Sequence, residues 1–168
     1  MATARVVLRL GDDVSTDIIY PGRFMATVLP TETPQHAFAD MVEFNKTLKG
    51  GQIPPGSVLV AGNNFGCGSS REQAVSCLKG HALVIVARNI ARIFLQNAIN
   101  LGLNVVMCPT IEADEGDELE VTATRVVNVT KGTSHATQPL PPARQAIIDA
   151  GGLIPYTRRL LLEERRPA

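Results

Sequence analysis

A glycine-bearing loop carries the side chains of this sequence that are best suited to chemistry. It reads Gly62-Asn-Asn-Phe-Gly-Cys-Gly-Ser-Ser-Arg71 and lies between an apolar run and a segment with helical periodicity. The hydroxyls of Ser69 and Ser70 stand next to Arg71, whose planar guanidinium suits a carboxylate. The N-terminus of a following helix would add backbone N–H groups and about half a positive charge. Such a loop can bind an acidic substrate and stabilise a serine alkoxide that abstracts a proton.

The same residues also fit a structural turn from a strand into a helix. Ser69 or Ser70 can cap that helix, and Arg71 can lie on the surface. Glycines at 66 and 68 allow either positive φ or a close approach of the backbone to a ligand. No Gly-Lys-Ser/Thr follows, so the loop is not a P-loop, and it also departs from the GxGxxG dinucleotide fingerprint. The residues alone leave the structural and the chemical interpretations open.

The segments around the loop predict a parallel α/β sheet. Strand, helix, strand, helix and strand follow one another from residue 57 to residue 107, the order typical of right-handed crossovers. Open sheets of this kind bind ligands beyond the carboxyl ends of their strands, which is where the loop would lie. The expected strands are 57–61, 82–87 and 103–107, and the expected helices are 71–79 and 89–100.

Weaker patterns extend this unit on both sides into one α/β domain over residues 1–168. We expect its core at residues 5–130 and a C-terminal helical segment at residues 140–165. A chain of 168 residues is long enough to bury a core without disulfides. The further elements expected are strands 5–10, 118–122 and 126–129 and helices 35–49, 144–150 and 156–165.

Charge and composition argue against several kinds of partner and cofactor. Sixteen basic and sixteen acidic residues cancel, whereas nucleic acids and anionic membranes normally demand a basic surplus. No apolar run is long enough to span a bilayer and no signal-peptide pattern is present, so a cytoplasmic location is expected. The cysteines, Cys67, Cys77 and Cys108, form no CxxC pair, and the last two lie in apolar stretches. We therefore expect no metal or iron–sulfur cluster on this chain.

The loop also resembles the signature of a known family. Asn64-Phe-Gly-Cys-Gly-Ser-Ser-Arg-Glu72 is similar to the swivelling domain of the aconitase superfamily and, more narrowly, to small subunits of 3-isopropylmalate dehydratase and related enzymes. Residues 11–19, 21–25 and 87–102 fit the same family in order and spacing. The resemblance implies a single aconitase-type swivelling domain with β/β/α layers, in which helices flank a largely parallel central sheet. It favours the chemical interpretation of the loop.

The resemblance implies a role for each residue of the motif. Ser69 is expected to be the catalytic base, while Ser70 and Arg71 orient and neutralise a substrate carboxylate. Asp17 is expected to pair with an active-site cation, although a turn-capping role fits it equally well. The implied reaction is reversible removal and readdition of water on a hydroxy-dicarboxylate. A 4Fe–4S cluster, the Lewis acid for the departing hydroxyl, is expected on a separate large subunit.

Residues 23–26 stand where the family has its substrate-recognition loop. In the family this loop usually reads Tyr-Leu-X, and an arginine at X accompanies a substrate side chain that bears a carboxylate. Phe24, Met25 and Ala26 correspond to these three positions. Arg23 is followed here by Phe24, Met25 and Ala26, and the absence of a cation at Ala26 favours an alkylmalate over aconitate- or homoaconitate-type substrates. These four residues are the expected substrate-binding residues of the segment. One methylene is worth only about 1–3 kcal/mol of discrimination, so isopropylmalate, dimethylmalate and citramalate stay open.

The leading interpretation is a hydro-lyase subunit that is active only with its large subunit, most simply in 3-isopropylmalate dehydratase. A related dehydratase of the dimethylmalate, citramalate or homoaconitate type is the alternative within the same class. Outside that class stand a carboxylate-binding module without chemistry and a scaffold for the large subunit. Gln73 stands where the family usually has histidine, so a charge-switching role at this position is in doubt.

Overall fold

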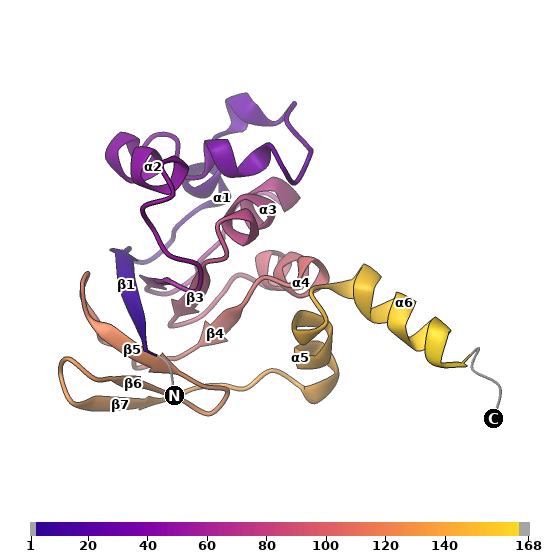
Figure 1. Cartoon of the computed structure of the whole chain (residues 1–168). Helices are drawn as coiled ribbons and strands as arrows, with labels where there is room; N and C mark the ends of the chain where they lie inside the picture. Colours follow the sequence, from indigo (N-terminus) through magenta and orange to yellow (C-terminus); the bar gives the residue numbers. More distant parts are fainter. Residues whose placement is uncertain (1–2, 165–168) are drawn as a thin grey trace.

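A seven-stranded sheet forms the centre of the computed structural model, which describes residues 3–164 (Figure 1). Residues 1–2 and 165–168, the two ends of the expected domain, lie outside the described residues. The strand order is β4-β3-β2-β1-β5-β6-β7, parallel from β4 to β1 and antiparallel from β1 to β7. The strands are β1 Ala4–Arg9, β2 Val58–Ala61, β3 Val84–Ala87, β4 Val105–Met107, β5 Glu118–Val121, β6 Arg125–Asn128 and β7 Thr133–Ala136.

Helices α1 to α4 gather on the side of the parallel strands, whereas β5 to β7 form the opposite side of the molecule (Figure 1). None of the helices in the described chain is long and apolar enough to cross a membrane. The helices are α1 Thr16–Ile19, α2 Val42–Lys49, α3 Glu72–Gly80, α4 Arg92–Leu101, α5 Pro142–Asp149 and α6 Leu153–Glu164, with short 3-10 helices at Gly22–Phe24 and Thr33–His36.

The parallel strands are buried on both faces, which explains their nearly continuous apolar sequences. All four residues of β2 are buried. Leu59 and Ala61 pack in a large cluster with the helices, whereas Val58 and Val60 pack in a second cluster with residues of β5 and β6. The carboxyl end of β2 is therefore held between two packed layers, and the loop that follows it starts from a rigid frame.

The two edge strands of the sheet approach each other at one point. The N–H of Gln138, just after β7, donates to the carbonyl of Met107 in β4 at 2.8 Å, and the two residues form an antiparallel bridge. The Cys108 Sγ donates to the carbonyl of Ala136 at 3.5 Å. The sheet is thus curled, with its antiparallel half folded back towards β4.

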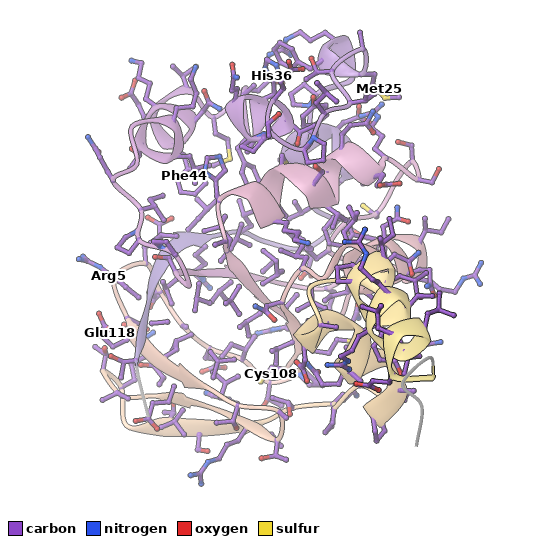
Figure 2. All side chains as sticks on the ribbon, turned by 45° about the vertical axis from the view of Figure 1, so that its right-hand side comes forward. Arg5, Met25, His36, Phe44, Cys108 and Glu118 are labelled. Atoms are coloured by element: carbon purple, nitrogen blue, oxygen red, sulfur yellow. The ribbon has the colours of Figure 1, made fainter. Side chains whose placement is uncertain are left out.

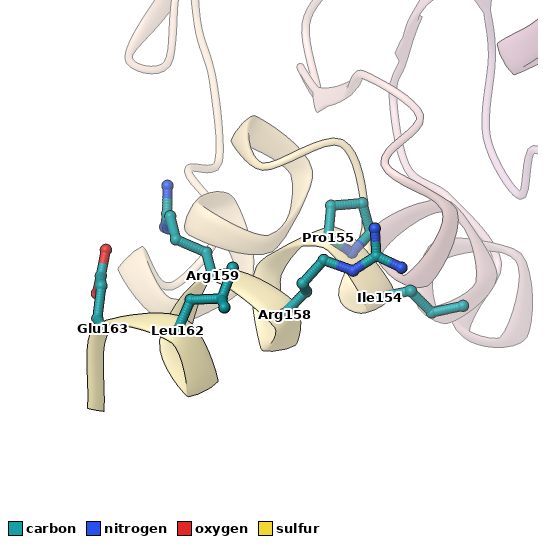
Figure 3. A pocket seen from close by; sticks show the side chains of 6 residues that line it. All are labelled: Ile154, Pro155, Arg158, Arg159, Leu162 and Glu163. Carbon is teal, nitrogen blue, oxygen red and sulfur yellow. The ribbon is translucent and has the colours of Figure 1, made fainter. Parts of the chain in front are cut away.

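Helix α6 projects from the body of the molecule (Figure 1). It exposes several large apolar side chains, among them Ile154 and Leu162. These two line a shallow pocket together with Arg158 and Arg159, and Figure 3 shows these side chains along the helix. The pocket includes none of the residues expected at the active site.

The predicted α/β class is confirmed, and most expected elements are present within a few residues of the expected bounds. The prediction of a helix at residues 35–49 is wrong for its first half, because the α-helix begins only at Val42. Phe38, with φ of +50°, has a left-handed backbone that interrupts a continuous helix. Strand β7 was not expected. Its sequence, Thr133-Ser-His-Ala136, has no apolar alternation, and it is mostly exposed.

Candidate active site

Two segments about fifty residues apart meet to form the candidate site. The N–H of Thr16 donates to the carbonyl of Cys67 at 2.8 Å, and the N–H of Gly66 donates to the carbonyl of Val14 at 2.7 Å. Ser15 and Cys67 also form a parallel bridge. This short pairing fixes the loop 62–71 against the start of α1 and brings Asp17, Ser69 and Arg71 to one surface.

Ser69 lies exposed at this surface next to a buried threonine. The Thr16 hydroxyl is 3.4 Å from the Ser69 hydroxyl and donates to the Ser69 carbonyl at 3.2 Å. Thr16 is only 1% exposed. Because a hydroxyl has one proton to donate, the bond from Thr16 to the carbonyl leaves Thr16 as an acceptor for the Ser69 hydroxyl. Thr16 thus orients the expected base while the Ser69 oxygen stays open to solvent.

Arg71 is held in place from one side. Its Nη1 donates to the Asp17 carboxylate and, at 3.3 Å, to the carbonyl of Tyr20. The side chain of Arg71 is 16% exposed and that of Asp17 is 61% exposed. A Cβ at Gly22 would lie 3.2 Å from Nη2, so the glycine leaves room for the guanidinium. The structure therefore brings Asp17 and Arg71 together as an ion pair at the surface that also carries Ser69.

One nitrogen of this guanidinium is left unpaired. The Nε of Arg71 is buried and has no hydrogen-bond partner within the described chain. An unsatisfied buried donor costs on the order of 1–3 kcal/mol. Arg71 therefore keeps one donor that no group of the described chain satisfies, while its Nη1 is held by Asp17 and Tyr20.

The serines do not cap α3, so that prediction is wrong. Helix α3 begins at Glu72, and its N-cap position is Arg71, with no side-chain cap bond. Gly68, with φ of +97°, turns the chain so that Ser69 faces Thr16, and the carbonyl of Ser70 accepts from Asn97 Nδ2 at 3.4 Å. The hydroxyls of Ser69 and Ser70 therefore remain available for a ligand.

The expected recognition residues lie beside this surface. Met25 and Ala26 are exposed, whereas Phe24 is half-buried and packs on the helical core. The Phe24 ring stacks on His36, with centroids 4.0 Å apart and planes 10° apart. Figure 2 shows Met25 and His36 at the same end of the molecule. The guanidinium of Arg23 also lies over the Phe24 ring, 4.6 Å from its centroid.

An ion pair and a neutral histidine set the electrostatics of the recognition residues. Arg23 pairs with Asp40 through two hydrogen bonds, of 2.5 and 3.3 Å, so its charge is already matched. Burial holds the pKa of His36 below its ordinary value, and the nearby charges of Lys49 and Arg23 act in the same direction. The imidazole is therefore neutral near pH 7 and packs on Phe24 as an aromatic ring.

The cysteines do not fit a metal cluster on this chain. Cys77 and Cys108 are buried in the two different core clusters, and burial raises the pKa of both thiols. Cys67 is half-buried and supports the site through its backbone carbonyl. Within residues 3–164, no three His, Cys, Asp or Glu side chains are grouped so that they could hold a metal ion.

Comparison with known proteins gives the family. The chain matches the family model described as Aconitase C-terminal domain over residues 27–109. It is also 42% identical to the 3-isopropylmalate dehydratase small subunit of Methanosarcina acetivorans, over 92% of this chain and 96% of that one. The chain belongs to the family of aconitase-type dehydratase small subunits.

Other members of the family agree with this assignment. The crystal structure of 3-isopropylmalate dehydratase from Methanocaldococcus jannaschii superimposes with a TM-score of 0.84, at 36% identity over 98% of each chain. The 2,3-dimethylmalate dehydratase small subunit of Eubacterium barkeri is 42% identical, over 89% of this chain and 93% of that one. The family resemblance inferred from the Ser-Ser-Arg loop is confirmed, and so is the fold that it implied.

The structure also adds residues that sequence reasoning missed. Thr16 and Asn97 contact the two serines, and Tyr20 contacts Arg71. Thr16 stands beside Asp17 in the Thr-Asp pair, and this was the only signal in the sequence that pointed to it. Asn97 lies within residues 87–102, which fit the family, but nothing in that pattern singled it out, and Tyr20 lies between two fitting segments; only the fold reveals their contacts.

Proposed function

We propose that this chain is the small subunit of a heteromeric hydro-lyase that interconverts 2- and 3-alkylmalates, with isopropylmalate as substrate. The observation that carries the proposal is the convergence of an exposed Ser69 hydroxyl and the Arg71 guanidinium on one surface of a chain from this family. The names of its relatives, which are dehydratase small subunits, support the reaction class. We propose that activity requires the large subunit.

Each residue has a distinct part in this mechanism. Ser69, as the alkoxide, takes a proton from the substrate carbon next to the hydroxyl-bearing carbon; hydroxide leaves, and a double bond forms between them. In the readdition step, hydroxide adds to the carbon that lost the proton, and Ser69 returns the proton to the carbon that lost the hydroxyl. Ser70 and Arg71 bind a carboxylate, and Thr16, as acceptor of the Ser69 hydroxyl proton, holds the neutral Ser69 side chain in position before it loses that proton. A 4Fe–4S cluster on the large subunit would supply the Lewis acid for the departing hydroxide.

The apolar recognition residues support an alkyl side chain on the substrate. Phe24, Met25 and Ala26 carry no charge, and Arg23, the cation among the four recognition residues, is paired with Asp40. A substrate with an additional carboxylate would find no free cation among these four residues. The identity to the dimethylmalate dehydratase subunit equals that to the isopropylmalate dehydratase subunit, so identity alone does not select the alkyl group.

The test uses the full chain assembled with its large subunit under anaerobic conditions. Turnover is measured for 3-isopropylmalate, 2,3-dimethylmalate, citramalate, homocitrate and citrate, with the isolated chain as blank. We expect the complex to turn over an alkylmalate and the isolated chain to be inactive. Preference for citrate or homocitrate would contradict the assignment of the recognition residues.

Replacement of the base tests the mechanism itself. We expect Ser69→Ala to lower kcat of the complex by about 100-fold or more, the usual scale for loss of a general base. Ser134→Ala, at an exposed serine of β7, is the matched control and should leave kcat unchanged. If Ser69→Ala stays within a few-fold of the wild-type rate, Ser69 is not the base. If the wild-type complex binds the dicarboxylate but turns nothing over, a carboxylate-binding module is the better conclusion.

A further inference from the structure

The side chain of Tyr20 contacts the recognition segment, while its backbone contacts the carboxylate-binding residue. We propose that Tyr20 is a positioning residue that holds residues 24–27 at a fixed place relative to Arg71, and that it thereby sets the discrimination between alkyl side chains. This inference rests on the proposed function. Tyr20 itself would touch no substrate, because the whole residue is 0% exposed.

The first contact is made by the hydroxyl group. The Tyr20 Oη donates to the carbonyl of Phe24 at 3.1 Å and lies 3.3 Å from the carbonyl of Thr27, within hydrogen-bond reach of both. These two carbonyls bracket Met25 and Ala26, whose side chains are exposed. Burial raises the pKa of Tyr20, so the hydroxyl stays protonated and remains a donor near neutral pH. A single buried group thus closes the turn that presents the recognition side chains.

The second contact is made by the backbone of the same residue. The carbonyl of Tyr20 accepts from Arg71 Nη1 at 3.3 Å. Tyr20 therefore connects the guanidinium that would bind the substrate carboxylate to the segment that would contact its alkyl group. The distance between Arg71 and residues 24–27 would therefore select substrates whose carboxylate and alkyl group are separated by a matching distance.

An independent contact holds the segment from the helical side. Gln73, in the first turn of α3, donates from Nε2 to the carbonyl of Met25 at 3.3 Å. The same turn follows directly on Arg71, so this bond also ties the recognition segment to the carboxylate-binding residue. Carbonyls 24, 25 and 27 are therefore fixed by two side chains that come from different elements.

The effect of losing one such bond is modest and measurable. A net hydrogen bond is worth a factor of about 2 to 10, and one methylene of substrate is discriminated by about 10- to 200-fold. Loosening of the segment should therefore weaken discrimination without abolishing catalysis. We expect Tyr20→Phe, which removes only the hydroxyl, to lower the ratio of kcat/KM for 3-isopropylmalate over citramalate by about 2- to 10-fold. The change should lie mainly in KM.

The matched control is Tyr156→Phe on α6, which is the other tyrosine of the chain and lies outside the site. It should leave the ratio unchanged. Gln73→Ala should shift the ratio in the same direction as Tyr20→Phe and serves as the test if that variant folds poorly. A purely structural Tyr20 would lower the activity on both substrates equally, and an unchanged ratio in folded Tyr20→Phe and Gln73→Ala would overturn the proposal.

Hydrogen exchange separates this inference from the proposed function. The N–H groups of Met25 and Thr27 donate to carbonyls of residues 22 and 24 within the turn. In the full chain, with no substrate present, Tyr20→Phe should raise their exchange rates by about 2- to 10-fold, whereas Tyr156→Phe should not. Unchanged exchange would refute the positioning role whatever the activity. A wild-type complex that is inactive on all alkylmalates, with exchange raised as expected, would refute only the function and the specificity that depends on it.

Discussion

Gly66 offers a direct test of how firmly the loop of residues 62–71 is held against the core. A Cβ at this position would lie 2.2 Å from Cγ and 2.5 Å from Cβ of Phe94. Phe94 is 2% exposed and packs edge-on against Phe65, with ring centroids 5.2 Å apart, so it has little room to move. Gly66 also has φ of +78°, a conformation that side chains disfavour.

The expected cost of Gly66→Ala follows from these two terms. A left-handed backbone costs a residue with a side chain about 1–2 kcal/mol. Overpacking of a tight core adds about 1–3 kcal/mol. We therefore expect Gly66→Ala to lower the free energy of unfolding by about 2–5 kcal/mol. Urea denaturation with an unchanged slope measures this loss.

Gly132→Ala is the matched control for the backbone term. Gly132 has φ of +67°, but a Cβ there would meet nothing within 4 Å. This variant should lose only about 1–2 kcal/mol, and the difference between the two variants isolates the contact with Phe94. Equal losses would show that Phe94 yields freely, and the loop would then not be held by the core as described.

Three further outcomes are expected. Arg71→Lys should raise KM for the dicarboxylate about tenfold or more while the thermal unfolding temperature changes little, because an ammonium lacks the paired donors; an unchanged KM would favour a scaffold. The hydrogen bond from the Asp114 backbone lowers the pKa of Asp117, so its contribution to stability is present above about pH 4 and is lost as the pH falls further; Asp117→Asn should flatten this loss in unfolding measured against pH. A thiol reagent near neutral pH should modify Cys67 in the folded chain, whereas Cys77 should react only after unfolding, as mass spectrometry would show.

Features confined to one stretch of sequence could be predicted. The apolar run of β2 and the glycines of the loop indicated a strand that leads into a tight turn, and Gly66 and Gly68 both have the positive φ expected of such a turn. The Ser-Ser-Arg sequence was specific enough to give the family. These predictions succeeded because burial and backbone conformation are dictated locally.

Contacts between distant segments could not be predicted. Thr16 meets Ser69 across 53 positions of sequence, and Tyr20 meets Arg71 across 51. Neither pair has a pattern of spacing, since both depend on the parallel pairing that brings the start of α1 beside the loop. The predicted serine cap of α3 was wrong because the helix begins at Glu72, which places Arg71 and neither serine at the N-cap position.

The bridge between Gln138 and Met107 bears on how this chain behaves when it is alone. An exposed, flat edge strand is a template to which other chains add strands, and this leads to aggregation. Here the outer strands, β4 and β7, converge at that bridge, and β4 has only three residues. Among the described strands, no long flat edge is left for another chain to extend. Another copy of the chain therefore finds little strand edge to pair with, and we expect contacts with other chains to be made by loops and helices.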